Sequence, residues 1–140
     1  MIKKIVIILT AMIAVLLMMT SCNNEEEQMR TPGSTSVGGA VILTGSEIDD
    51  EWQIVEPQVY FSANEEFYFY FHNNLTFDTE QVTIQLIDNR DEEILAENVF
   101  AVDPEEKVLV DMVWFGKEGM YTIKALVDEE IRATREVLIE

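Results

Sequence analysis

Residues 119–127 read Gly-Met-Tyr-Thr-Ile-Lys-Ala-Leu-Val, and this stretch decides the fold. Side chains of a β-strand point to opposite faces in turn, so apolar residues at every second position indicate a strand with one buried face. Four residues take those positions here: Tyr121, Ile123, Ala125 and Val127. We therefore predict a half-buried strand over this stretch, with a glycine-containing turn at residues 116–119 in front of it.

Six further runs of strand-forming residues are separated by turn-forming residues. They cover residues 58–61, 67–71, 82–86, 94–100, 108–114 and 131–139. Val82, Ile84 and Leu86 repeat the period of two, and the run 108–114 places Trp114 in the register of Val110, which we expect to face the core. About seven short strands at even spacing, without a convincing helix, are typical of an antiparallel sandwich or a small barrel.

The residues Gly119-Met120-Tyr121-Thr122-Ile123, followed by a hairpin into the last strand, resemble the immunoglobulin-like domains common in secreted bacterial proteins. The resemblance covers about residues 50–140 and concerns fold, not activity. It implies an all-β, immunoglobulin-like antiparallel β-sandwich of about seven strands at residues 41–140, with the hydroxyl of Tyr121 bonded to backbone as a tyrosine corner. Arg135 departs from the pattern, because it falls on the inward register between Ala133 and Val137. A bulge, or an edge position for the last strand, would accommodate it.

The first 22 residues carry the three parts of a secretory signal. Lys3 and Lys4 precede an apolar run of 15 residues, residues 5–19, and small residues then lead to Cys22, the single cysteine. This ending resembles the lipobox of bacterial lipoproteins, which implies a signal peptide at residues 1–21 and a diacylglycerol on the thiol of Cys22. The run is shorter than the roughly 18 residues of a membrane-spanning helix, and an uncleaved N-terminal anchor is the alternative.

Residues 22–40 are expected to form an acidic and polar flexible tether, since they cannot bury enough apolar surface to become ordered. Residues 25–27 are three glutamates, which resemble the surface-export signal of some Gram-negative lipoproteins. A solubilising charge run explains them equally well. Together these features predict a lipid-anchored protein of the bacterial cell envelope, at the outer membrane or the cell surface, held to the membrane by the acylated Cys22.

Charge and residue types exclude several classes of function. Cleavage before Cys22 leaves 7 basic and 27 acidic residues, a net charge of −20, which repels nucleic acid. His72 is the single histidine, so the usual zinc sites are out of reach. The chain contains no glycine-rich phosphate loop and no Gly-x-Ser-x-Gly motif. We therefore expect no enzyme activity, no catalytic residue and no cofactor.

Calcium is the one ion worth weighing, because acidic loops supply the oxygen ligands that it prefers. Asp49 and Asp50 lie in one acidic cluster, and Asp88 and Asp91 lie in another. The spacing matches no EF-hand, and a solvated acidic loop explains each cluster more simply.

The block 67–71, FYFYF, is the best indication of a contact surface. If its phenylalanines face the core, alternation places Tyr68 and Tyr70 on the outer face, where tyrosines are common in protein and sugar recognition. We therefore predict a non-catalytic binding module for an envelope or extracellular protein or glycan, of unknown oligomeric state. A structural accessory subunit of an envelope complex is the alternative, and a carboxylate-dependent glycan enzyme is a third class.

Overall fold

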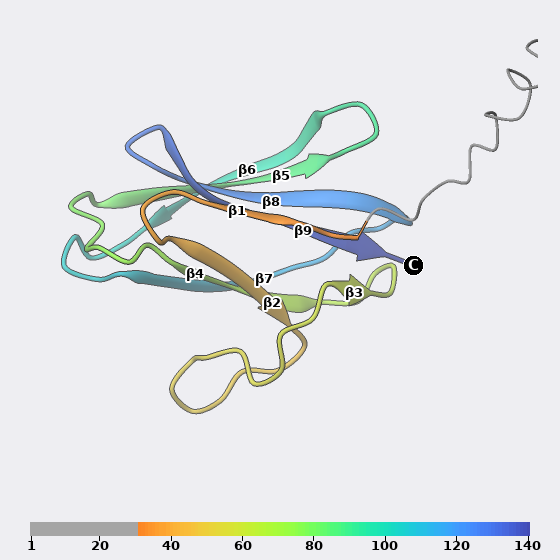
Figure 1. Cartoon of the computed structure of the whole chain (residues 1–140), viewed down its shortest axis with the longest axis horizontal. Coiled ribbons are helices and arrows are strands. Elements are labelled where there is room, and N and C mark those ends of the chain that lie inside the picture. Colours follow the sequence, from red (N-terminus) through yellow and green to blue (C-terminus); the bar gives the residue numbers. More distant parts are fainter. Residues whose placement is uncertain (1–30) are drawn as a thin grey trace, which may run out of the picture. The chain divides into compact units, whose positions relative to one another are not determined.

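The computed structural model describes residues 31–140, and these form a sandwich of two facing β-sheets (Figure 1). The strands are β1 (Ser34–Ser36), β2 (Val41–Gly45), β3 (Tyr60–Phe61), β4 (Phe67–His72), β5 (Gln81–Asp88), β6 (Glu93–Ala101), β7 (Val108–Val113), β8 (Gly119–Val127) and β9 (Glu130–Ile139). One sheet has the order β1-β9-β8-β5-β6, with the short β3 also pairing with β9, and the other has the order β2-β4-β7. All pairings are antiparallel except that of β3 with β9. The expected all-β antiparallel sandwich is confirmed.

The structure contains two strands, β1 and β2, where the sequence analysis predicts no strand. The sequence places residues 34–36 in the flexible tether, whereas the structure pairs them with β9, and the compact unit begins at Pro32 instead of Val41. The residues of β1 are polar and exposed, so its order comes from backbone pairing with β9, which no apolar pattern can indicate. The expected signal peptide, Cys22 and residues 22–30 of the expected tether lie outside the described residues.

The core lies between the two sheets and is dominated by aromatic rings. Phe67, Phe69 and Phe71 on β4 are fully buried and face the interior, as the alternation predicts. The ring of Phe61 stacks on that of Phe67, with 3.7 Å between the centroids. Each such side chain contributes about 1.5–3 kcal/mol by leaving water, so β4 is a main source of stability. Within residues 31–140, no helix is long and apolar enough to cross a membrane.

Tyr121 forms the predicted tyrosine corner at the start of β8. Its hydroxyl donates a hydrogen bond to the carbonyl oxygen of Lys117 at 2.9 Å, and its ring stacks on Phe115 with a centroid distance of 4.2 Å. Gly119, between them in sequence, has φ of +149°, a conformation that favours glycine. The quoted stretch thus ties the turn at residues 116–119 to the core.

Trp114 lies on the opposite face from the one that the sequence predicts. In the pairing of β7 with β4, Val113 is opposite Phe67 and Leu109 is opposite Phe71, so the odd-numbered residues of β7 face inward. Val113 is buried, and Trp114 is 57% exposed. The prediction is wrong because both registers of this run carry apolar residues, and only the pairing with β4 decides between them.

Arg135 lies on the inward register of β9, as its place in the sequence indicates. It is opposite Ile123 of β8, which is fully buried, and Ser34 of β1 is its partner along the other edge of β9. A bulge occurs in this pairing, between Ala125 and Leu126, but it leaves Arg135 facing inward. The Nε atom of Arg135 is buried without a hydrogen-bond partner among the described residues, and this desolvation lowers the pKa of the guanidinium.

Candidate functional site

The outer face of the three-stranded sheet carries the two tyrosines singled out from the sequence. Tyr68 and Tyr70 alternate with the buried phenylalanines of β4 and are half-buried, so their predicted orientation is confirmed. Tyr70 lies between Leu43 of β2 and Val110 of β7, and Tyr68 lies beside Met112 of β7. We call these five residues the tyrosine face. It is directed away from the other sheet, on the lower side of the molecule in Figure 1.

His72 continues the row of Tyr68 and Tyr70 at the end of β4. Its Nδ1 atom accepts a hydrogen bond from the backbone N–H of Asn74 at 3.2 Å, and its ring is parallel to that of Tyr70, with 6.5 Å between the centroids. The histidine therefore holds the turn after β4 and flanks the tyrosine face. This arrangement suits a structural histidine.

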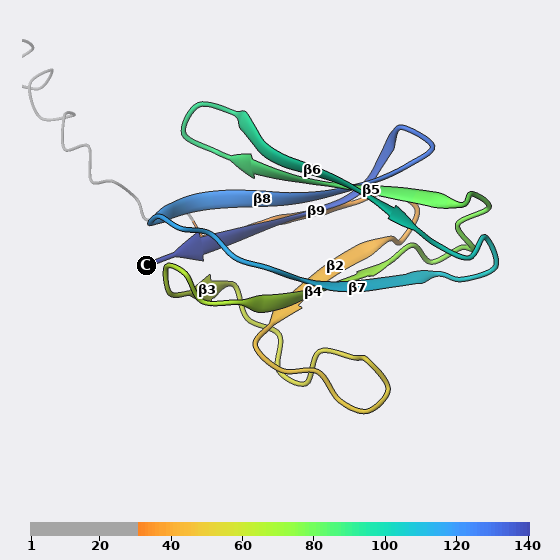
Figure 2. The ribbon, with the colours of Figure 1, turned by 180° about the vertical axis from the view of Figure 1, so that it is seen from behind.

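A long loop, residues 46–59, projects from the edge of the tyrosine face (Figures 1 and 2). An isolated bridge between Ile48 and Ile54 closes its tip, where Trp52 is 63% exposed with φ of +63°. The carboxylate of Asp49 accepts hydrogen bonds from the backbone N–H groups of Glu51 and Gln53, both at 2.9 Å. Sequence reasoning overlooked Trp52, although a lone tryptophan among acidic residues between two strands is a signal for an exposed aromatic side chain.

The acidic residues considered for calcium are in two separate places. Asp49 and Asp50 lie in the loop 46–59, where Asp49 caps backbone groups. Asp88 and Asp91 lie at the hairpin between β5 and β6, where the carboxylate of Asp91 accepts the backbone N–H of Glu93. No group of three or more potential ligands that could hold a metal ion occurs within residues 31–140. The carboxylates considered for calcium thus form no cluster of three or more such side chains among the described residues.

Asp88 is a buried carboxylate with a dedicated partner. The guanidinium of Arg90 contacts both of its oxygens, with Nε at 3.0 Å from Oδ1, and the backbone N–H of Arg90 also donates to Oδ1 at 3.0 Å. These hydrogen bonds lower the pKa of Asp88 to about 2, against the smaller opposing effect of burial. Burial and the nearby Asp88 carboxylate raise the pKa of Tyr121. Asp88 is thus held ionised, the opposite of what a general acid requires.

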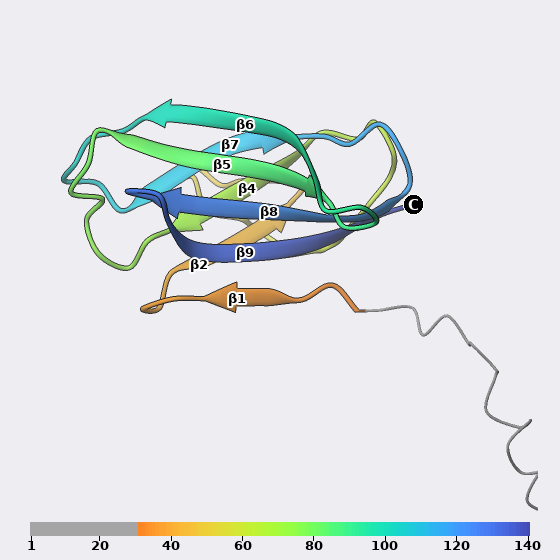
Figure 3. The same cartoon turned by 90° about the horizontal axis from the view of Figure 1, so that it is seen from above.

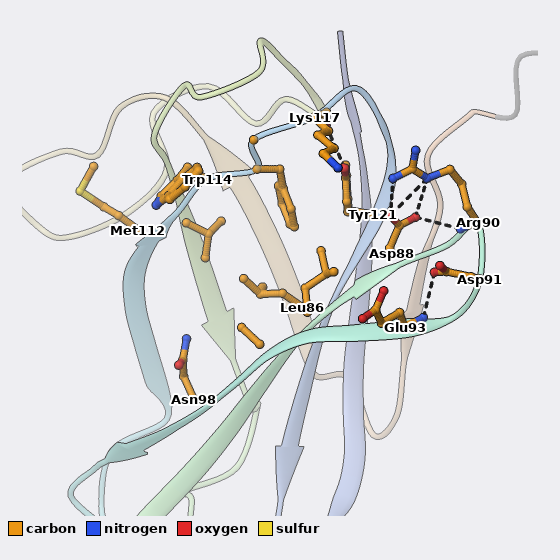
Figure 4. Close-up of a pocket in the computed structure, with 15 residues that line it drawn as sticks. Leu86, Asp88, Arg90, Asp91, Glu93, Asn98, Met112, Trp114, Lys117 and Tyr121 are labelled. Atoms are coloured by element: carbon orange, nitrogen blue, oxygen red, sulfur yellow. Dashed lines mark hydrogen bonds and ion pairs between the residues drawn. The ribbon is translucent and has the colours of Figure 1, made fainter.

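A groove of about 720 Å³ opens between β6 and β7, beside this ion pair (Figure 4). Four residues of the core line the groove: Leu86, Val113, Phe115 and Tyr121. Met112 and Trp114 form one wall, and the hairpin with Asp88, Arg90 and Glu93 forms the other, as Figure 4 shows. The sequence prediction of a buried Trp114 conceals this groove, since the tryptophan lines it instead of filling the core.

Comparison with known proteins gives only distant structural likenesses. No family model matches the chain, and no curated protein matches it significantly. Among solved structures, the PmoD soluble domain from Methylocystis sp. (strain Rockwell) is similar with a TM-score of 0.46 and 9% identity, over 72% of this chain and 90% of that chain. The CARDB domain of a Pyrococcus furiosus protein, solved in complex with di-metal ions, has a TM-score of 0.39 and 17% identity, over 75% of this chain and 97% of that chain. At these values neither likeness transfers a ligand or an activity.

Proposed function

We propose that the chain is a lipid-anchored lipoprotein of the bacterial cell envelope whose β-sandwich is a non-catalytic binding module for an envelope or extracellular protein or glycan. The tyrosine face is the observation that carries this proposal. Tyr68, Tyr70, Leu43, Val110 and Met112 form one continuous apolar and aromatic surface on the outside of a sheet, rather than scattered single residues. Such surfaces, rimmed by polar residues, mark interaction sites more often than bare solvent-facing sheet.

The described side chains support binding over catalysis. His72 hydrogen-bonds within its own turn, and Asp88 has a pKa of about 2 beside Arg90. A carboxylate enzyme needs one carboxyl group with a raised pKa, held close to a second one. The pKa of Asp88, the buried carboxylate of the groove, is lowered instead of raised.

The membrane attachment rests on Cys22 and the signal before it. Several acyl chains anchor a protein stably, since each buried CH₂ contributes about 0.8 kcal/mol. In cells fed with a labelled fatty acid, the wild-type chain should carry the label, and Cys22→Ala should accumulate as an unlabelled precursor. Label that persists in Cys22→Ala would refute acylation at this residue.

Site-specific photo-crosslinking tests the binding face directly. A photoreactive phenylalanine analogue at Tyr70 should give a discrete crosslinked product in intact envelopes. The matched control carries the same analogue at Lys124, which faces outward on the opposite sheet, and should give no such product. The Tyr70 product should also weaken when Tyr68 is changed to serine in the same chain. Identical products from the two positions would mean that the tyrosine face is not a specific binding surface.

A further inference from the structure

The strand β6 is a long edge of its sheet. It spans nine residues, and among the described residues it pairs with β5 alone. Ile94, Leu95 and Val99 on this strand are each about half exposed. Proteins usually shorten, charge or cover such edges, because an unpaired strand invites pairing with another chain. In Figure 3, β6 is the outermost strand of its sheet, on the same side of the sandwich as β7.

The hydrogen-bond pattern identifies which backbone groups of β6 are free. The backbone N–H of Val102, directly after β6, donates to the carbonyl of Glu80 at 2.9 Å. Bonding groups alternate along an antiparallel strand, so the backbone groups of Phe100 and Asn98 also point to β5. The backbone groups of Val99 and Glu97 therefore point away from β5, to the free edge. The bond from Asn89 N–H to the Met120 carbonyl at 3.1 Å fits the same alternation, since it pairs the odd-numbered residues of β5 with β8.

The groove runs beside this free edge. Ala96 and Asn98 of β6 line it, and they are opposite Leu86 and Ile84 of β5, so they lie on the inward side of β6. Glu97 lies on the outward side, where its carboxylate accepts a hydrogen bond from the amide of Gln85 at 2.7 Å. A strand added at β6 would therefore place alternate side chains into the groove and next to Glu97.

The neighbouring free edge, β7, is protected where β6 is not. Asp111 is opposite Phe69, which puts a carboxylate on the inward register of this edge strand. An inward-directed charge on an edge is a recognised barrier to pairing with a further strand. The run Ala96–Ala101 of β6 carries no proline, no lysine and no inward-directed charge. Glu93, opposite the buried Asp88, places a carboxylate on the inward register at the start of β6, so the open part of this edge is the run Ala96–Ala101.

We propose that β6 and the groove bind an extended basic segment of a partner protein, which adds to the sheet as a strand beside β6. Its inward side chains are apolar and fill the groove against Val113 and Trp114, and its outward side chains are basic and lie near Glu97. Backbone pairing supplies affinity and the alternate side chains supply specificity. This site goes beyond the tyrosine face and meets it at Met112.

Charge selects a basic partner over a second copy of this chain. Three acidic and three basic residues precede residue 31, so residues 31–140 carry the full net charge of −18. Two such domains repel each other, and edge-to-edge pairing of β6 would bring the Glu93 and Glu97 carboxylates of both copies together. A lysine-containing or arginine-containing segment removes this repulsion.

The test uses a synthetic peptide of ten residues in which valine and lysine alternate, with blocked termini. Val99→Pro removes the free N–H at the edge and keeps the ladder to β5, and Val99→Ala is its matched control, with a shortened side chain and an intact N–H. We expect the lysine peptide to bind Val99→Pro at least about fivefold more weakly than Val99→Ala. Proline has no N–H to donate to the peptide, and its ring stands at the edge in place of that N–H. A peptide of alternating valine and glutamate should not bind. Tyr68→Ser with Tyr70→Ser should keep the peptide affinity, which separates this site from the tyrosine face.

Several outcomes would overturn the proposal. Equal affinities of Val99→Pro and Val99→Ala would exclude strand addition, and so would the absence of binding of the lysine peptide at millimolar concentration. A dimer of the chain that Val99→Pro abolishes would assign the edge to a second copy. If Val99→Pro does not fold, two modified lysine peptides take its place in the test. One is N-methylated on every valine, and the other is N-methylated on every lysine. Strand addition requires one register to abolish binding while the other preserves it, and equal effects of both would exclude it.

Discussion

The two faces of β4 carry aromatic side chains that differ only by a hydroxyl group, but the two sets of rings differ in burial. On the inner side, Phe67, Phe69 and Phe71 are buried between the sheets, and on the outer side, Tyr68 and Tyr70 are half-buried among apolar neighbours. A phenol needs a partner for its hydroxyl when it is buried, whereas a phenyl ring does not, so the choice of ring follows the face. The inner face of this strand therefore stabilises the fold, and its outer face is the one that we propose for recognition.

The largest expected difference between the two faces is in stability. Phe69→Ala should lower the free energy of unfolding by about 3–5 kcal/mol, because it removes a fully buried ring from the core. Tyr70→Ala, one residue away, should cost less than about 1 kcal/mol, as expected on a partly solvated surface. Urea denaturation of the two variants measures both values. Similar losses would show that the outer face is packed as tightly as the core.

Arg135 is a charged residue on the inward register of the other sheet. Arg135→Met should raise the free energy of unfolding by about 1 kcal/mol, since it removes a buried donor that has no partner among the described residues. Arg132→Met is the matched control with the opposite sign. The Nε of Arg132 donates to Oδ1 of the buried Asn73 at 3.2 Å, so its loss should destabilise the fold. A destabilising Arg135→Met would mean that the guanidinium is well solvated.

The Asp88–Arg90 pair lies where the inner side opens at the groove. The pKa of Asp88 is lowered from 3.8 to about 2, so its stabilisation is complete above pH 4 and is lost as the pH falls toward 2. Because Arg90 is largely exposed and its charge is screened by solvent, we expect Arg90→Gln to lower the free energy of unfolding only modestly at pH 7. The difference from wild type should shrink toward zero between pH 4 and pH 2 in acid-unfolding experiments. A difference that is constant over this range would exclude the ion pair as its source.

Trp114 is an exposed aromatic residue on the outer side, and the effect of its loss on stability should be the smallest. Trp114→Ala should change the free energy of unfolding by less than about 0.5 kcal/mol, as at most surface positions. Val113→Ala, its buried neighbour, should cost more than about 1 kcal/mol by the loss of apolar burial. The fluorescence of Trp114 should also be quenched readily by acrylamide. A large loss of stability would return Trp114 to the core and close the groove.

The sequence predicted what depends on local alternation. The strand from Tyr121 to Val127, the tyrosine corner and the outward direction of Tyr68 and Tyr70 all follow from a single clear period of two. The face of β7 does not follow, because its apolar residues occupy both registers and the pairing of Val113 with Phe67 decides between them. Local alternation therefore predicts the buried face of a strand only where the apolar residues occupy a single register.

Other features depend on residues far apart in the chain. β1 is ordered by its pairing with β9, about a hundred residues later, and its own residues are serine and threonine. The groove combines Leu86, Ala96 and Val113 from three different strands, and none of them carries a local signal of a cavity. The free edge of β6 is likewise a property of the order of strands in the sheet, which single-strand patterns do not determine.

If the outer face of β4 is a contact surface, its tyrosines should be covered in intact envelopes, and tyrosine labelling in place measures this coverage. A tyrosine-modifying reagent is applied to the purified domain and to intact envelopes, and each residue is quantified by mass spectrometry. Tyr60, which is half exposed, and Tyr121, which is buried, are internal references. We expect Tyr68 and Tyr70 to react in the purified domain and to be protected in envelopes, while Tyr60 reacts and Tyr121 resists in both. Equal reactivity of Tyr68 and Tyr70 in the two preparations would show that no partner covers the outer face of β4.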